Sequence, residues 1–486
     1  MRRNKFMTAA VCAAILSVMT TFHAYSDTTA VTADGTASGS TYVVAEASGT
    51  EDAAASEADV SSAEAGASSA EADASSAEGT GTSAIGTGDL FSSRDLEQTA
   101  DLTQAQKITV SDGETVTIKT EGVYVISGTA SNAQILVTAG DEDKVQLVLD
   151  GVSMTNESTP CIYVKNADKV FVTTTDSENT LSVTGTFTAD DTTNTDAVIF
   201  SRDDVVLNGT GTLSISSTDN GISSKDDIKV TGGTLNISCT SDALEANESI
   251  LIADGTIAIK TSKDGLHAEN DEDNTTGYIY IGGGTLTIEA GDDAIHATTI
   301  AQIDGGTIST SSREGIEGTW IQINDGTVTI EASDDGINAG QKSNITTPTA
   351  EFNGGTVTIS MGSGDTDAVD SNGNLIINGG TLDITAQSPF DYDGTAQLNG
   401  GTLIVNGTQT DSITNQMMGG GHGGWGGGNN TGGADGSSME GGMRGGMKGG
   451  MRGGHGRWSD SQSQSQSQTQ SQTQSQTQDS TKSEIY

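Results

Sequence analysis

The residues with the clearest chemical potential are acidic side chains that recur once in every repeat of the chain. Each begins a short motif of an acid, Gly or Ala, an aliphatic residue, any residue and a small residue, as in residues 264–268 (DGLHA). Aligned repeats place eight residues, seven acids and one Asn, in one column: Asp196, Asn220, Asp242, Asp264, Asp293, Glu314, Asp335 and Asp367. If successive repeats form adjacent strands, neighbours in the column lie about 4.8 Å apart. Unit charges at that spacing repel by about 1 kcal/mol in water, and by about 3–4 kcal/mol at an effective dielectric constant near 20.

This repulsion predicts that the acid column binds cations. Ca²⁺ takes about six to eight oxygen ligands, which carboxylates and turn carbonyls can supply together. We therefore predict calcium as the cofactor. The predicted calcium ligands are Asp242, Asp264, Asp292, Asp293, Asp334, Asp335 and Asp367. The alternative is that stacked Asp and Asn side chains cap turn amides without a metal, a role that suits Asn220.

A second column is expected to run beside the acid column and to face outwards. It contains Glu245, His267, His296, Glu317, Asn338 and Asp370. His267 and His296 would be neighbours in successive repeats, which allows a transition-metal site, although we favour a plain surface pair. Both histidines are predicted to contact the ligand.

Basic residues beside the acid column raise the possibility of catalysis. Lys225, Lys263 and Arg313 lie in or next to it, and Lys263 and Arg313 are also predicted to contact the ligand. A calcium-dependent polysaccharide lyase needs a cation to neutralise a uronate carboxylate and a base beside it. The motifs, however, occupy turn positions, and no long loops are present to wall a cleft. These features favour binding without catalysis.

Sugar binding usually also involves an exposed aromatic ring. The candidates are Trp320, Tyr278, Tyr280, Phe390 and Tyr392. Tyr278 and Tyr280 share the alternation of buried Ile residues and could be partly buried. Trp320 opens a strand-like segment and is the aromatic ligand contact that we predict.

The elements that must position these columns are themselves repeated. Gly-Gly-Thr or a close variant precedes an aliphatic-x-Ile segment, and the Gly before the Thr recurs at spacings of 22, 22, 29, 22, 20, 29, 25 and 21 residues. Apolar and polar residues alternate around it with the period of two that is typical of strands. We predict an all-β, right-handed parallel β-helix with coils of about 22 residues, each made of three short strands and tight turns. A leucine-rich repeat and a nonapeptide calcium β-roll fit less well, because neither pattern is present.

Two cysteines follow the first 26 residues. Cys161 and Cys239 would lie about three coils apart, which is beyond the roughly 7 Å between Cα atoms that a disulfide spans. We therefore predict that both are small buried residues.

Composition limits the partners and the location. The formal charge is −45, and it becomes −48 without residues 1–26, which contain three basic and no acidic residues. Nucleic acid and anionic lipid are therefore excluded as direct partners, and an acidic polymer would need a bridging cation. Residues 1–26 have a basic start, an apolar segment and a small-x-small end, which predict a secretory signal peptide. We expect a secreted protein at the cell surface, with no membrane insertion after cleavage.

The predicted organisation has four parts. The signal peptide (1–26) is followed by a low-complexity acidic Ala/Ser/Glu linker (27–95) and the β-helix (96–415). A Gly/Met-rich and Ser/Gln-rich tail (416–486) ends the chain, and we expect the linker and the tail to be disordered.

Several segments resemble a known family. Residues 122–128 (GVYVISG) and 145–152 (VQLVLDGV), the repeated Asp-Gly-Ile/Leu-His/Asn-Ala and Gly-Gly-Thr motifs and the Gly-Met tail are similar to the clostridial β-helix carbohydrate-binding domain. The resemblance covers about residues 105 to 415. It implies a pectate-lyase-like β-helix with bound calcium that binds polygalacturonate and cellulose at the bacterial surface.

These features predict a monomeric, non-enzymatic protein that binds an acidic, pectin-like polysaccharide or cellulose in a calcium-dependent manner. The alternatives are a calcium-dependent pectate-type lyase and a structural adhesin that binds protein.

Overall fold

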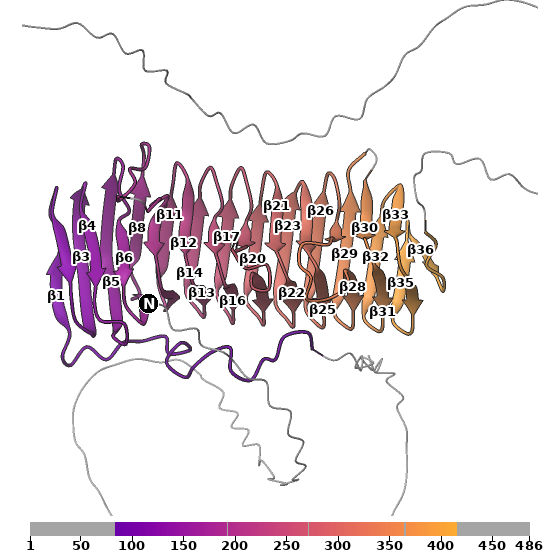
Figure 1. The fold of residues 1–486 in the computed structure, drawn as a ribbon, viewed down its shortest axis with the longest axis horizontal. Coiled ribbons are helices and arrows are strands. Elements are labelled where there is room, and N and C mark those ends of the chain that lie inside the picture. The colour runs from indigo at the N-terminus through magenta and orange to yellow at the C-terminus, as the bar shows by residue number, and fades with distance from the viewer. Residues whose placement is uncertain (1–82, 192, 271, 364–365, 416–486) are drawn as a thin grey trace, which may run out of the picture. The chain divides into compact units, whose positions relative to one another are not determined.

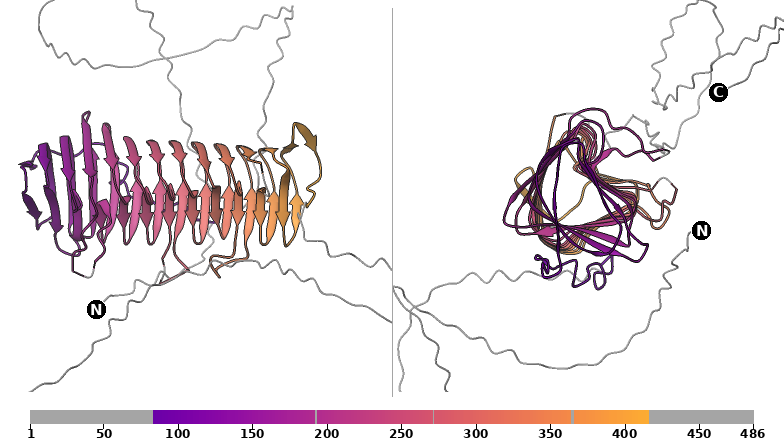
Figure 2. Two further views of the ribbon diagram at one scale, coloured as in Figure 1. Left: turned by 90° about the horizontal axis from the view of Figure 1, so that it is seen from above. Right: turned by 90° about the vertical axis from the view of Figure 1, so that its left-hand side faces the viewer.

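The computed structural model describes residues 83–415 except 192, 271 and 364–365 (Figure 1). These residues form 36 β-strands and no helix, and almost all strand pairs are parallel. The all-β, parallel, solenoid-like architecture that the repeats predict is therefore confirmed. Viewed along the stack, the strands enclose a roughly triangular cross-section with three faces (Figure 2). We call one circuit of the three faces a coil.

The first and second faces belong to one 24-stranded sheet, in which the long strands β3 (Gly122–Ser131) and β5 (Lys144–Asn156) contribute to both faces. The other strands of the first face are β1 (Gln106–Thr109), β7 (Lys169–Thr174), β10 (Asp204–Gly209), β13 (Asp227–Val230), β16 (Ser249–Ile252), β19 (Tyr278–Ile281), β22 (Ile300–Ile303), β25 (Trp320–Ile323), β28 (Thr349–Phe352), β31 (Asn374–Ile377) and β34 (Ala396–Leu398). The other strands of the second face are β8 (Glu178–Val183), β11 (Thr212–Ser216), β14 (Thr234–Ser238), β17 (Thr256–Lys260), β20 (Thr285–Glu289), β23 (Thr307–Ser312), β26 (Thr327–Ala332), β29 (Thr356–Met361), β32 (Thr381–Thr385), β35 (Thr402–Val405) and the antiparallel β36 (Thr408–Thr410).

The third face is a separate 12-stranded sheet, and it carries the acidic motifs. Its strands are β2 (Thr115–Ile118), β4 (Gln134–Thr138), β6 (Ile162–Asn166), β9 (Ala197–Ser201), β12 (Asn220–Ser224), β15 (Leu244–Ala246), β18 (Leu266–Ala268), β21 (Asp293–Ala297), β24 (Glu314–Gly318), β27 (Ile337–Ala339), β30 (Asp367–Ser371) and β33 (Ser388–Tyr392).

Strand register follows the repeated motifs. Thr212 pairs with Thr234, and Thr234 pairs with Thr256, so that equivalent residues of successive coils lie side by side. The inward-facing residues of these strands, such as Ile237 and Ile259, stack in a continuous buried core. Fully burying one such side chain contributes about 1.5–3 kcal/mol, and the stack repeats this gain in every coil.

Glycines form the turns between the first and second faces. Gly233 has φ 78° and Gly284 has φ 89°, a left-handed backbone conformation that a side chain disfavours. A Cβ at Gly284 would also lie 2.8 Å from the carbonyl oxygen of Gly255 in the previous coil. The Gly-Gly-Thr motif is therefore required by close packing between coils as well as by the turn.

A segment that we call the strap (residues 83–98) lies across the outer side of the first face, where it appears along the lower edge of the strands in Figure 1. Backbone amides of Ala84 and Ile85 bind the side chains of Gln322 and Gln302 at 2.8 and 2.6 Å. Ile85 and Leu90 are buried in an apolar cluster on this outer side. The packed part of the chain thus begins before residue 96, the boundary that composition predicts, because these few apolar residues cover outward-facing apolar side chains of the first face.

The buried side chains confirm one prediction and correct another. Cys161 and Cys239 are both buried and free, as expected. Phe390 was a candidate for stacking on a sugar, but it is only 2% exposed because its side chain fills the core under β33. Tyr280 is also buried, beneath the strap.

Within residues 83–415 no helix is long and apolar enough to cross a membrane. The predicted signal peptide, the tail and most of the predicted linker lie outside the described residues.

Candidate functional site

The acid column lies where the chain enters the third face, and four of its side chains bind backbone amides of the next coil. The Oδ1 atom of Asn220 accepts a hydrogen bond from the backbone N–H of Asp242 at 2.8 Å. The Oδ1 atom of Asp242 in turn accepts one from the backbone N–H of Asp264 at 3.1 Å. The Oδ1 atom of Asp264 accepts a hydrogen bond from the backbone N–H of Asp293 at 2.9 Å. Asp335 binds the amide of Asp367 in the same way, at 3.2 Å. The capping role that was the alternative to calcium is thus present in these coils.

The second carboxylate oxygens in the middle of the column contact basic groups. Asp242 lies 3.1 Å from Lys263 Nζ and 3.6 Å from His267 Nδ1. Asp264 lies 2.7 Å from His267 Nδ1, and Asp293 lies 2.9 Å from His296 Nδ1. Lys263 and both predicted histidines therefore act as internal counter-ions for predicted calcium ligands.

Arg313 connects carboxylates of neighbouring coils. Its guanidinium contacts Asp292, lies 2.6 Å from Asp334 and from Glu314, and lies 3.4 Å from Asp293. These carboxylates raise the pKa of Arg313 further above its usual value, despite the opposing effect of burial. The paired acids that were predicted to cluster do so, but around a cation that the chain itself supplies.

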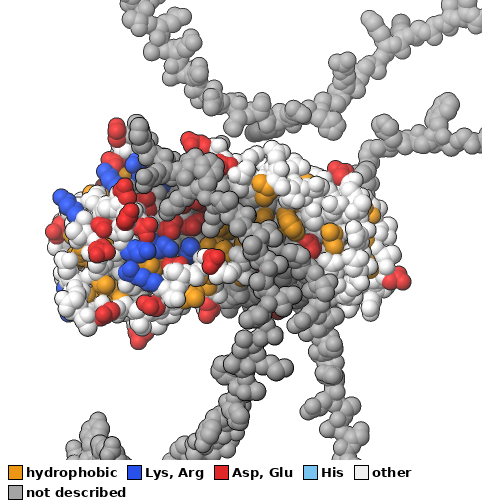
Figure 3. Space-filling model, turned by 60° about the horizontal axis from the view of Figure 1, so that its bottom comes forward, with side chains coloured by type: hydrophobic (Ala, Val, Ile, Leu, Met, Phe, Trp, Pro, Cys, Tyr) orange, Lys and Arg blue, Asp and Glu red, His pale blue; other side chains and the backbone are white. Residues whose placement is uncertain are grey.

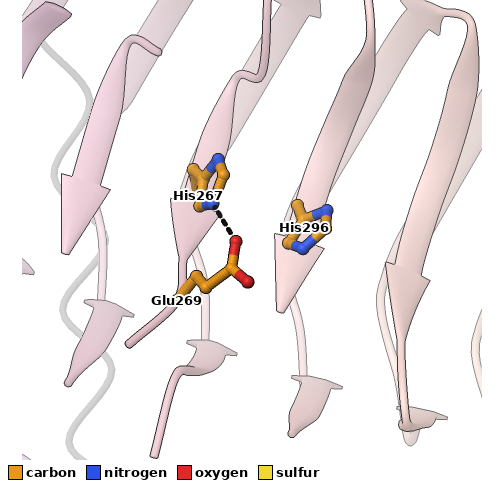
Figure 4. Close-up of side chains that lie close together, drawn as sticks. All are labelled: His267, Glu269 and His296. Carbon is orange, nitrogen blue, oxygen red and sulfur yellow. Dashed lines mark hydrogen bonds and ion pairs between the residues drawn. The ribbon is translucent and has the colours of Figure 1, made fainter. Parts of the chain in front are cut away.

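The outward column forms as the sequence predicts. His267 pairs with His296 in register, and the two rings stack with their centroids 4.7 Å apart and their planes 26° apart. His267 Nε2 lies 3.0 Å from Glu269 (Figure 4). His296 Nδ1 also lies 2.8 Å from Glu317, which in turn lies 2.7 Å from Lys342.

Electrostatics keep both histidines charged. Burial lowers the pKa of His267, but hydrogen bonds to Asp242, Asp264 and Glu269 outweigh it and raise that pKa to about 12. The pKa of His296 rises to about 9, because Asp293 and Glu317 outweigh burial and the repulsion from His267. Burial opposes the effect of His296 and Lys342 on Glu317, yet the pKa of Glu317 falls to about 2.

Carboxylates at the C-terminal end of the third face have a different environment. Among the described residues, no Lys, Arg or His forms an ion pair with Asp335 or Asp370. Burial and the charges of Asp370 and Asp334 raise the pKa of Asp335 to about 7. Burial and the charges of Asp391 and Asp367 raise that of Asp370 to about 6. Asp335 and Asp370 are thus buried acids that neighbouring carboxylates repel and that no basic side chain of the described residues pairs with.

A further acidic group was missed in the sequence. Asp204, Asp226 and Asp227 place carboxylate oxygens within 4.8 Å of one another at the turn that follows the third face. Burial, with the charges of Asp204 and Glu248, raises the pKa of Asp226 to about 8. Two Asp-Asp pairs one coil apart, at 203–204 and 226–227, are the signal that could have identified it. On the face shown in Figure 3, Lys and Arg side chains lie beside Asp and Glu side chains.

Trp320 lies apart from the acid column. It begins β25 on the first face, where its side chain is half-buried and its indole Nε1 donates to Glu351 at 3.2 Å. Tyr278, also half-buried, begins β19 on the same face. The predicted ligand contacts are therefore distributed over two faces, with the aromatic ring on one and the charged groups on the other.

Together, these features define a parallel β-solenoid protein with a repeated acidic column along one face. The chain belongs to the family described as carbohydrate-binding domain-containing protein, whose model matches residues 112–367 and 310–421.

Two proteins with similarity to parts of the chain can be named. A carbohydrate-binding domain-containing protein of Acetivibrio thermocellus is 39% identical over 129 residues, which are 26% of this chain and 45% of that relative. The matched part thus spans less than half of the relative's length. A solved structure described as the polysaccharide lyase-like protein from C. thermocellum, in a gadolinium derivative, is 32% identical, with a TM-score of 0.44; the match covers 46% of this chain and 99% of the other.

Proposed function

We propose that this protein binds an acidic, pectin-like polysaccharide outside the cell, through calcium ions held on its third face and without catalysis. The family description supports carbohydrate binding. The observation that supports the calcium part is the pair Asp335 and Asp370: burial and neighbouring carboxylates raise the pKa of both side chains, and neither forms an ion pair with a basic side chain of the described residues. The proposal includes secretion, a right-handed solenoid with coils of about 22 residues, and a monomeric protein.

Charge explains why a cation would be needed. The chain carries a formal charge of −45, so a polyuronate would be repelled by it. A calcium ion bound by protein carboxylates can accept further oxygen ligands from a uronate, since it takes about six to eight in total. Bridging by calcium turns the repulsion into attraction.

The C-terminal end of the third face is the better calcium site. In the middle of the column, Asp242 and Asp293 already contact Lys263, Arg313 and the histidines. A cation there would have to displace these groups. At Asp335 and Asp370, a cation would instead relieve the existing repulsion.

The basic groups beside the column support a role without catalysis. A general base must be deprotonated near the working pH. Burial lowers the pKa of Lys263, but Asp242 and Asp264 outweigh it and raise that pKa, and the pKa of Arg313 is raised as well. Both side chains are held as cations by carboxylates of their own chain, which makes them poor bases.

A neutral glycan such as cellulose would use a different surface. The half-buried Trp320 and Tyr278 of the first face could stack on uncharged sugar rings, and this contact needs no cation. We propose this binding as the second function, weaker and independent of calcium.

The test is a pull-down of the full chain on insoluble polygalacturonate, with calcium and then with a chelator. We expect retention in calcium only, and loss of retention in an Asp335→Asn/Asp370→Asn double variant. Asp254→Asn, an exposed turn carboxylate far from both residues in sequence, is the matched control. Retention in chelator would overturn the calcium mechanism, and appearance of unsaturated sugar products would overturn the non-catalytic role.

A further inference from the structure

The stacked histidines carry a feature that polysaccharide binding does not explain. His267 and His296 are neighbours in β18 and β21, and Glu269 follows β18 directly. One ring nitrogen of each histidine and one carboxylate oxygen of Glu269 lie within 4.8 Å of one another. Figure 4 shows the three side chains next to one another, with a nitrogen of His267 directed at the Glu269 carboxylate. Three metal-binding side chains thus converge on one small region.

Buried carboxylates fix the orientation of both rings. Asp264 lies 2.7 Å from His267 Nδ1, Asp293 lies 2.9 Å from His296 Nδ1, and both aspartates are less than 5% exposed. A carboxylate that accepts from Nδ1–H leaves Nε2 of the same ring as the atom that can bind a metal. The same carboxylate–histidine arrangement orients and strengthens histidine ligands in zinc proteins.

We propose that His267, His296 and Glu269 bind one divalent transition-metal ion, with Zn²⁺ as the best match. Two imidazole nitrogens, one carboxylate oxygen and a water molecule make up the four-coordinate set that zinc prefers. Such a site is distinct from the proposed calcium site, because calcium takes oxygen ligands and avoids imidazole.

Metal binding requires the three ligand atoms, which lie within 4.8 Å of one another, to move closer together. Ligand atoms around a tetrahedral zinc ion lie about 3.3 Å apart, given metal–ligand bonds of about 2.0–2.1 Å. The Glu269 side chain is 45% exposed, so its carboxylate can move towards the two rings without disturbing the core. The two rings, which stack with centroids 4.7 Å apart, must also tilt so that their Nε2 atoms approach each other.

The surrounding charges suit a dication. Asp242, Asp264 and Glu269 lie within ion-pair distance of His267, and Asp293 and Glu317 lie within that distance of His296. The negative charge of these carboxylates attracts a metal cation to the two rings. Binding through Nε2 also leaves both Nδ1 contacts to the aspartates intact.

The experiment is a titration of the full chain with Zn²⁺, followed by calorimetry, and a parallel titration with Co²⁺, followed by visible absorption. Both are made in excess Ca²⁺, so that oxygen-ligand sites are occupied. Because His422 and His455 could also bind a metal ion, the background is a His422→Ala/His455→Ala variant. We expect one equivalent of Zn²⁺ per chain in this background, and a Co²⁺ spectrum typical of tetrahedral coordination.

Variants of two of the three ligands decide the outcome. His296→Gln and Glu269→Gln should each weaken Zn²⁺ binding by at least about tenfold. The exposed Glu269 provides a test that does not depend on the stability of the fold. Glu289→Gln, an exposed carboxylate on the second face, is the control and should bind as the background does. Absence of zinc binding in the background chain, or equal binding in the Glu269→Gln variant, would overturn the proposal. Either result would leave the calcium-dependent retention on polygalacturonate unaffected.

Discussion

The carboxylate of Asp264 binds the next coil and its own coil at once. Its Oδ1 atom accepts the backbone amide of Asp293 at 2.9 Å, and its Oδ2 atom lies 2.7 Å from His267 Nδ1. This one acidic side chain therefore does two things, since it satisfies a turn amide of the next coil and contacts a histidine of the outward column.

The two roles of Asp264 can be separated by mutation. Asp264→Asn keeps an oxygen that can accept the Asp293 amide but removes the negative charge, whereas Asp264→Ala removes both. Leaving a buried amide unsatisfied costs about 1–3 kcal/mol. We expect the Ala variant to unfold at a lower denaturant concentration than the Asn variant. Equal stability of the two variants would show that the turn bond contributes little.

Stability should fall with rising pH because of Asp335. Its folded-state pKa is raised to about 7 from 3.8, so the folded state holds a proton that the unfolded state has already released. This contribution is fully present below pH 3.8 and is lost as the pH rises through about 7. In chelator, we expect the melting temperature of Asp335→Asn to rise relative to that of the wild type as the pH increases from about 5 to about 8. A parallel pH dependence of the two proteins would contradict this assignment.

Removal of Arg313 should have opposite effects on stability and on calcium affinity. Arg313→Gln leaves Asp292, Asp334 and Glu314 without their shared cation, so the melting temperature in chelator should fall. The effect of each exposed pair is modest, about 1 kcal/mol or less, because Arg313 is 42% exposed. Calcium should restore more stability to the variant than to the wild type.

The control for Arg313→Gln is Lys260→Gln, which removes an exposed ion pair with Glu289 on the second face. Its melting temperature should change little, with or without calcium. An equal response of both variants to calcium would argue against cation binding at the position of the guanidinium.

The two surfaces for sugars should be separable. Trp320→Ala is expected to reduce retention on cellulose without changing calcium-dependent retention on polygalacturonate, because Trp320 lies on the first face and the acid column lies on the third. Loss of one sugar–aromatic contact should weaken binding by about 0.5–1.5 kcal/mol. Affinity gels that contain each polysaccharide measure both effects, and equal losses on both would show a single binding surface.

The attachment of the strap to the first face should depend on Asp95. This side chain is 1% exposed, accepts the amide of Ser92 at 2.9 Å and lies 3.3 Å from Lys169 and 4.0 Å from Lys229. Asp95→Ala should release residues 83–98 to proteolysis, with a loss of about 1–3 kcal/mol of stability. Glu97→Ala, a neighbouring exposed acid, is the control and should leave cleavage unchanged.

The sequence by itself determined the architecture and the columns. Gly-Gly-Thr motifs and alternating apolar residues recur at nearly constant spacing, and parallel strands stack equivalent residues side by side. The pairing of His267 with His296 and of Asp293 with Glu314 could therefore be predicted from alignment of the repeats alone.

Only the tertiary structure decided which partner each charged side chain has. Repetition fixes the position of a residue along the stack, but partners also depend on side-chain direction and on groups that do not repeat, such as Arg313 and Lys342. The position of the strap could not be predicted from the sequence either. Its few apolar residues pack against Leu251 and Tyr280, which face outwards and lie far away in the sequence. Periodic contacts are encoded locally in the repeats, whereas contacts between unlike segments arise only when the folded chain brings them together.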